Sequence, residues 1–279
     1  MRVLTSIALR IFTAVTLLTL DGASITLAQE ESRNQVGLGF GGSDYHTLDT
    51  HASPLIFSRI GVAPILLFTR EEENCRHYAE GAFYYAYLTT LNDNFTVDNW
   101  RARARYSYLR GLSSLPVSDE DVHLFVGGSV ASYYNRSNYY YSWGSEVGTS
   151  IVTWYWSHSL DLAAQVEYTP SWDRTISGSR GGLFSALVFM PVISNVSRPQ
   201  YSSSGDYNYT ENTWKPKAFG KMEFFPKNFS LDAIISYRRP VSKYFAFLLT
   251  YEFYYSTYDK PSDVTAYMQN FRAGLFFRF

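Results

Sequence analysis

The chain contains 279 residues, and its 24 lysines and arginines nearly balance its 25 aspartates and glutamates. A formal net charge of −1 argues against a nucleic-acid-binding protein, which typically carries a basic surface or a high isoelectric point. The single cysteine excludes an intrachain disulfide framework, and aromatic residues supply 18% of the chain, including 24 tyrosines and 20 phenylalanines.

Residues 1–28 have the pattern of a cleavable secretory signal peptide. Arg2 and Arg10 precede a mostly apolar stretch, 11–20, and small residues follow this stretch up to Ala28. This apolar stretch matches a signal-peptide core and is too short for a membrane-spanning helix. The sequence therefore predicts a signal peptide over 1–28 and a mature domain over 29–279; an uncleaved anchor is the alternative.

Apolar residues alternate with polar or small residues along most of the mature domain, as in half-buried β-strands. Several segments keep this alternation for the roughly 9–11 residues that a strand needs to cross a bilayer. The pattern predicts about twelve strands, and ten or fourteen are the alternatives because residues 194–217 form a long, mostly polar stretch. The expected ranges are 35–42, 57–69, 76–90, 98–110, 122–134, 146–156, 159–169, 180–193, 213–225, 229–238, 243–256 and 266–279.

The segments between the expected strands alternate in character. Long polar or tyrosine-rich segments, such as 135–145, alternate with shorter turns, among them WSHS at 156–159 and the proline-led 239–243. Long loops at one end and short turns at the other are typical of outer-membrane β-barrels.

The C-terminal segment NFRAGLFFRF places Phe271, Leu275, Phe277 and Phe279 on one face of the expected last strand. It resembles the closing strand of Gram-negative outer-membrane β-barrel proteins. The resemblance implies that these four residues form the assembly signal recognised by the barrel-assembly machinery, and that the protein is exported to the outer membrane.

The expected fold is therefore all-β: a transmembrane, antiparallel, up-and-down β-barrel. Its expected partners are outer-membrane lipid and the barrel-assembly machinery. No nucleic-acid partner is expected, and the sequence does not point to a particular soluble or surface partner.

A row of arginines is the most distinctive feature of the expected wall. In WRARARYSYLR, residues 100–110, strand geometry places Arg101, Arg103 and Arg105 on one face. An arginine at the bilayer midplane costs about 2–4 kcal/mol when it faces lipid, so we expect these three to face the lumen. Glu80 has an ambiguous face. The carboxylates expected on the lumen face are Asp161, Glu167, Asp232 and Glu252.

Two hypotheses follow for this lumen. The charges can pair across it and close the barrel, or the arginines can line a water-filled pore that attracts anionic solutes. Three tyrosine- and tryptophan-rich segments, 83–87, 154–156 and 251–255, are expected to supply interfacial aromatic belts on the outer face.

No pattern of catalytic or metal-binding residues emerges. His158 lies beside Ser157 and Ser159, but neighbouring residues on a strand point to opposite faces, which places them poorly for proton transfer. The acidic and histidine residues around His46 and around His123 match no close metal-ligand spacing. Cys75 is expected in a turn. No catalytic residue, cofactor or metal is therefore assigned.

The leading functional hypothesis is a small, porin-like channel or a structural barrel with tyrosine-rich outer loops. One alternative is an outer-membrane hydrolase acting on lipid or lipopolysaccharide, for which His158 and Ser159 are the residues to test. The other is a surface-binding or secretion-associated barrel.

Overall fold

The computed structural model describes residues 33–50, 52–90, 95–117, 120–141, 150–170, 182–198, 218–242, 244–260 and 263–279. The chain divides into two units, Met1–Glu31 and Ser32–Phe279, and every described residue belongs to the second. The expected signal peptide, 1–28, lies outside the described residues. In the described part of the chain, no helix is long and apolar enough to span a membrane.

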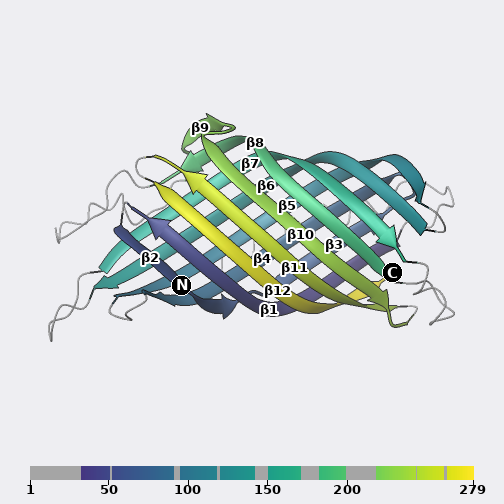
Figure 1. Ribbon diagram of the computed structural model, residues 1–279, viewed down its shortest axis with the longest axis horizontal. Helices are drawn as coiled ribbons and strands as arrows, with labels where there is room; N and C mark the ends of the chain where they lie inside the picture. Colours follow the sequence, from purple (N-terminus) through teal and green to yellow (C-terminus); the bar gives the residue numbers. More distant parts are fainter. Residues whose placement is uncertain are drawn as a thin grey trace. The chain divides into compact units, whose positions relative to one another are not determined.

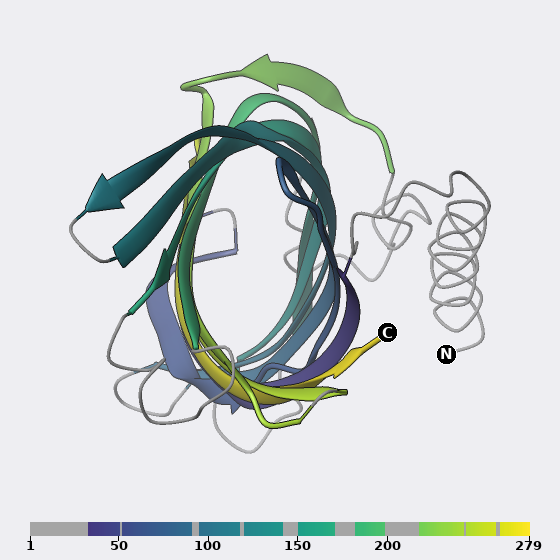
Figure 2. The same cartoon turned by 90° about the vertical axis from the view of Figure 1, so that its right-hand side faces the viewer.

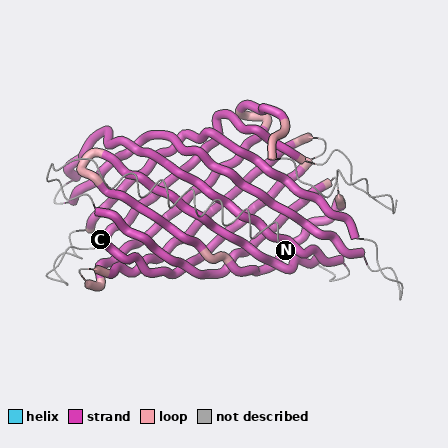
Figure 3. Tube along the Cα trace, turned by 180° about the vertical axis from the view of Figure 1, so that it is seen from behind, coloured by secondary structure: helices cyan, strands magenta, loops and turns pink. Residues whose placement is uncertain are grey.

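Within the described residues, twelve β-strands form one antiparallel sheet that wraps around a single lumen (Figure 1, Figure 2). Strand structure makes up almost the whole described wall when the barrel is seen from behind (Figure 3). The expected antiparallel up-and-down barrel of about twelve strands is therefore confirmed. The strands are β1 (Arg33–Asp49), β2 (Ser53–Val62), β3 (Ile65–Glu71), β4 (Cys75–Thr89), β5 (Phe95–Val117), β6 (Glu120–Tyr141), β7 (Ser150–Thr169), β8 (Leu183–Ser197), β9 (Lys221–Phe224), β10 (Asn228–Pro240), β11 (Phe245–Tyr258) and β12 (Val264–Arg278).

The sheet closes on itself at two places that the chain order does not dictate. β1 pairs with β12 along nearly its whole length, and β8 pairs with β10. The backbone hydrogen-bonding groups of the ring therefore find partners on both sides, which is what a sheet surrounded by lipid requires.

Two positions in the wall are each shared by two consecutive strands. β2 and β3 both pair with β1, one with each half of it. Between them, Ala63 N donates to Gly41 O (3.0 Å) and Phe83 N donates to Pro64 O (3.0 Å), so the wall continues through the break. β9 and β10 likewise both pair with β8, β9 with its C-terminal part and β10 with its N-terminal part. β9 curves outward from the ring (Figure 2). Because two pairs share a position, the twelve strands occupy ten positions around the lumen.

Three details of the expected strands were wrong. One expected strand is interrupted at Pro64, which has no N–H to donate to the ladder. Residues 150–156 of one expected strand and the whole of the next, 159–169, belong to the single strand β7, so no turn occurs at 156–159. The first residues of the expected strand, 146–149, lie outside the described part of the chain. Of the expected strand 213–225, only β9 is a strand among the described residues.

The two faces of the wall differ as the alternation predicts. On β4, Tyr84 and Ala86 are buried, whereas Phe83, Tyr85 and Tyr87 are between 42% and 46% exposed. The exposed outer face carries mostly apolar and aromatic side chains. The buried inner face carries the polar and charged ones together with a second set of aromatic rings.

Candidate functional site

The arginine row of β5 lies inside the barrel. Arg101, Arg103 and Arg105 are 0%, 3% and 7% exposed, whereas Tyr106 and Tyr108, on the other face of the same strand, are 49% and 46% exposed. Strand alternation alone accounts for this division, because successive side chains point to opposite sides of the wall.

Arg103 is the centre of a group of ion pairs that crosses the lumen. Its guanidinium contacts Glu80 on the neighbouring strand β4. It also lies 2.7 Å from Asp232 Oδ2 on β10 and 2.5 Å from Glu252 Oε1 on β11. At least three other strands separate β5 from β10 and β11 in either direction around the ring. These contacts therefore join opposite walls.

Two further arginines complete this group. Arg105 Nη2 lies 2.6 Å from Asp232 Oδ2. Arg272 Nη2, on β12, lies 2.6 Å from Glu252 Oε2 and donates to Tyr84 OH at 2.9 Å. Three guanidinium groups thus face three carboxylates in a water-poor interior. We refer to Glu80, Arg103, Arg105, Asp232, Glu252 and Arg272 as the central charge cluster.

Arg101 lies beside this cluster, against aromatic rings. Its guanidinium carbon is 3.5 Å from the ring centroid of Tyr45 and 4.9 Å from that of Tyr84. Its Nη1 also donates to Met268 Sδ at 2.6 Å. The negative face of an aromatic ring attracts a cation, so these rings stabilise the buried charge.

A second set of rings fills the lumen toward the end where β1 meets β2. The tyrosine layer comprises Tyr45, Tyr133, Tyr139, Tyr155, Tyr254 and Tyr258, all of which are at most 8% exposed. Tyr133 stacks on Tyr254 with ring centroids 5.4 Å apart, and Tyr155 meets Tyr258 edge-on at 6.1 Å. Such offset and edge-to-face pairs are the favourable arrangements of aromatic rings.

The expectation that the aromatic segments form outer belts was therefore wrong for part of each segment. Within 83–87 and 251–255, Tyr84 and Tyr254 point into the lumen, while their neighbours face outward. In 154–156, Tyr155 is likewise buried in the tyrosine layer.

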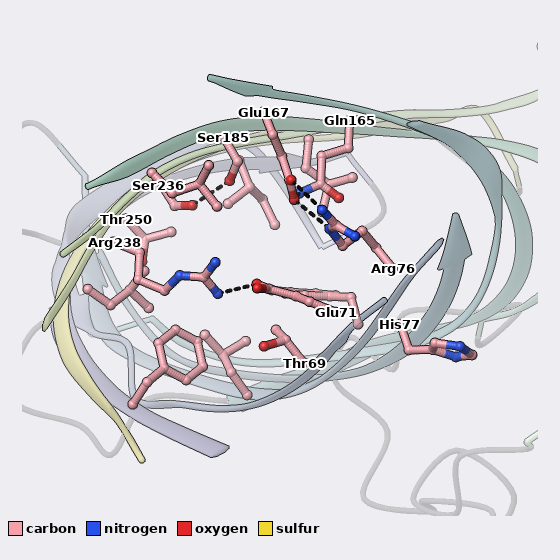
Figure 4. A pocket seen from close by; sticks show the side chains of 17 residues that line it. Thr69, Glu71, Arg76, His77, Gln165, Glu167, Ser185, Ser236, Arg238 and Thr250 are labelled. Carbon is pink, nitrogen blue, oxygen red and sulfur yellow. Dashed lines mark hydrogen bonds and ion pairs between the residues drawn. The ribbon is translucent and has the colours of Figure 1, made fainter. Parts of the chain in front are cut away.

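A small cavity lies on the side of the central charge cluster that is away from the tyrosine layer, toward the end of the barrel where β1 begins and β12 ends. Its volume is about 70 Å³. Figure 4 shows Arg238 directed at Glu71 and Arg76 directed at Glu167 across this space, whereas His77 points away from it. The Arg76–Glu167 pair has an N···O distance of 2.9 Å.

The four carboxylates expected in the lumen are all buried on the inner face of the barrel wall. Asp232 and Glu252 belong to the central charge cluster, Glu167 pairs with Arg76, and Asp161 accepts a hydrogen bond from Ser129 (2.9 Å). Arg272 was not among the residues expected to line the lumen, and the face of Glu80 was ambiguous from the sequence. The C-terminal alternation places Arg272 opposite the outward phenylalanines, which already predicts that it faces inward.

The structure does not bring His158 and Ser159 together. His158 lies on the outer face, with Nε2 2.8 Å from Ala218 O and its ring 5.4 Å from that of Phe219. Ser159 follows it directly in β7 and therefore belongs to the other face. His46 contacts Asp44 within β1 at 3.2 Å. His51, the other histidine of this segment, lies outside the described part of the chain.

The four C-terminal residues of the expected assembly signal lie on the outer face. Phe271, Leu275, Phe277 and Phe279 are between 46% and 63% exposed. Their recognition by the assembly machinery stays a prediction.

No family model matches this chain, and no curated protein matches it. Solved structures do resemble it. They include the outer-membrane protease OmpT of Escherichia coli, with 10% identity and a TM-score of 0.48 over 91% of this chain and 99% of that one. Neisserial surface protein A has 10% identity and a TM-score of 0.34 over 88% and 97% of the two chains. The attachment invasion locus protein Ail of Yersinia pestis has 8% identity and a TM-score of 0.33 over 90% and 100%.

The barrel fold that the expected resemblance to Gram-negative outer-membrane β-barrel proteins implies is confirmed by the strand order and the ring closure of the described residues. The three proteins are named as a protease, a surface protein and an attachment protein. The activity of this chain is argued below from its own lumen and surface.

Proposed function

We propose that this chain is an integral outer-membrane barrel whose lumen is closed at rest and which acts through its surface rather than as an open channel. The outward face supports the membrane location. Exposed side chains such as Val130 (59%), Leu160 (54%) and Leu162 (55%) form a surface that lipid would cover.

The observation that carries the closed lumen is the simultaneous contact of Arg103 with three carboxylates from three strands. In a water-filled pore the charged side chains would keep their hydration. Here Arg103 and Glu252 are 3% and 0% exposed, so their charges are satisfied by one another. The tyrosine layer fills the lumen next to them and adds a second barrier to ions.

The orientation follows from the connections between strands. The end that holds the start of β1 and the end of β12 has the short connections 72–74, 118–119 and 241–244, although 170–182 is longer. The opposite end has the longest connection, 198–220, which contains Tyr201, Tyr207 and Tyr209, and also 142–149, together with the shorter 50–52, 90–94 and 259–263. Short turns face the periplasm and long loops face outward in this class of barrel. The connection 198–220, with its three tyrosines, would therefore face the cell exterior.

Recordings from planar lipid bilayers test the closed lumen. The parent protein should insert without producing stable current steps. The double variant R103A/E252A removes one charge of each sign and two side chains that meet across the lumen, so it should conduct measurably. Stable current steps in the parent protein would instead establish a channel, whose ion preference Arg101, Arg103 and Arg105 would then influence.

Protease added to intact cells tests the orientation. It should cleave within 198–220 and leave the short connection 72–74 intact. The reverse pattern would show that the barrel is inserted the other way or not inserted at all.

A further inference from the structure

Three side chains suited to a metal ion lie together beside the short turn between β3 and β4, outside the lumen. Cys75 Sγ is 3.0 Å from Glu72 Oε2 and 3.8 Å from His77 Nε2. All three ligand atoms lie within 4.8 Å of one another, and each residue is half-buried. We propose that Glu72, Cys75 and His77 bind a zinc ion.

The spacing fits tetrahedral zinc. Zinc–sulfur bonds of about 2.3 Å and zinc–nitrogen or zinc–oxygen bonds of about 2.0–2.2 Å place neighbouring ligand atoms roughly 3.5 Å apart. The two observed distances from Cys75 Sγ fall on either side of that value. Small side-chain movements would therefore allow all three groups to bind one ion, with a water molecule as the fourth ligand.

The local fold holds two of these ligands on one side of the wall. Cys75 and His77 are two positions apart on β4 and therefore share its outer face. Arg76, between them, points the other way and is held by Glu167 in the lumen. Glu72 N donates to Cys75 O at 3.0 Å, which closes the turn and brings the Glu72 side chain back beside the thiol.

The Nδ1 atom of His77 has a hydrogen-bond partner that would orient the imidazole ring for metal binding through Nε2. His77 Nδ1 lies 2.8 Å from Tyr106 OH on β5, so Nε2 is the nitrogen that faces Cys75. Metal-binding histidines are typically held in this way through their other nitrogen. Figure 4 shows the His77 ring outside the wall, away from the lumen cavity.

The donor set favours zinc among the common divalent ions. A thiolate and an imidazole are soft or borderline ligands, whereas magnesium and calcium prefer oxygen alone. The thiolate and the Glu72 carboxylate would together balance the charge of Zn²⁺. Arg70 contacts the other carboxylate oxygen, Oε1, at 2.7 Å, which leaves Oε2 directed at the thiol.

Cobalt binding to the full chain, refolded in detergent with its thiol reduced, tests the site. One equivalent of Co²⁺ should give a thiolate-to-cobalt charge-transfer band, and Zn²⁺ should abolish it. C75S should lose the band, H77A should weaken binding by at least about tenfold, and Y106F should weaken it by about tenfold through loss of the orienting contact. H123A is the matched control, because His123 lies on β6 outside this group, and its band should be unchanged.

A second measurement does not depend on variants. Zn²⁺ should slow the modification of Cys75 by a maleimide in the parent protein. A parent protein without a saturable charge-transfer band, or with a thiol that reacts equally fast with and without Zn²⁺, would overturn the proposal. These outcomes are independent of the closed lumen, which the bilayer recordings test separately.

Discussion

The central charge cluster and the tyrosine layer fill neighbouring parts of the same lumen by different physical means. In the cluster, Arg103 and Glu252 are buried charges, each with several partners. In the tyrosine layer, Tyr133 and Tyr254 are buried rings that stack on each other. The side chains of both regions are buried, but only the first region depends on the balance of opposite charges.

This difference has an energetic consequence. A buried ion pair is worth little relative to apolar packing, yet removal of one partner leaves an uncompensated charge and is strongly destabilising. Aromatic packing loses only the contacts and the volume of the ring that is removed. The cluster should therefore be the less tolerant of the two regions to single substitutions.

The largest effect is expected for R103M. Methionine keeps much of the side-chain volume but leaves Glu80, Asp232 and Glu252 with fewer cations, so the free energy of unfolding should fall by about 3–5 kcal/mol. Equilibrium unfolding in detergent micelles, followed by tryptophan fluorescence, measures this change. The matched control R59M alters an exposed arginine and should change stability by less than about 0.5 kcal/mol.

A double substitution separates charge balance from packing. R103M/E252Q removes one charge of each sign, so its loss of stability should be smaller than the sum of the losses in the two single variants. Additive losses would show that the two side chains act mainly through packing rather than through their ion pair.

An intermediate effect is expected at Tyr45, in the tyrosine layer. Y45A removes a fully buried ring and should destabilise the barrel by about 3 kcal/mol. Y45F keeps the ring under Arg101, and the hydroxyl that it removes has no hydrogen-bond partner among the described residues, so the change should stay below about 0.5 kcal/mol. The same unfolding measurement applies, and a large loss in Y45F would show that the hydroxyl, not the ring, stabilises the layer.

Period-two alternation was sufficient to predict much of this architecture. Because side chains alternate strictly along a strand, it placed Arg103 in the lumen and Asp232 and Glu252 on the same side of the wall. It could not predict which of them meet. Arg103 and Asp232 are 129 residues apart, and their contact depends on how the ring closes between β8 and β10.

Two predictions made from the sequence fail for local physical reasons. His158 and its serine neighbours suggested a turn, but the polar His158 ring is accommodated on the outer face by Ala218 O and Phe219, from a distant segment. Tyrosine also suits either face of the wall, because its ring can pack in the lumen or at a membrane interface. The composition of 83–87 therefore did not reveal that Tyr84 points inward.

The smallest loss among the lumen arginines is expected for R101M, which tests where the charged region ends. Arg101 lies over the rings of Tyr45 and Tyr84 rather than at the centre of the three carboxylates. Methionine removes the cation–π contacts, worth about 2 kcal/mol when desolvated, but also relieves the burial of a charge. The unfolding free energy should therefore fall by less than about 2 kcal/mol, clearly less than in R103M. An equal loss in the two variants would mean that Arg101 belongs energetically to the central charge cluster, and that the boundary between the two regions lies at the rings beyond it.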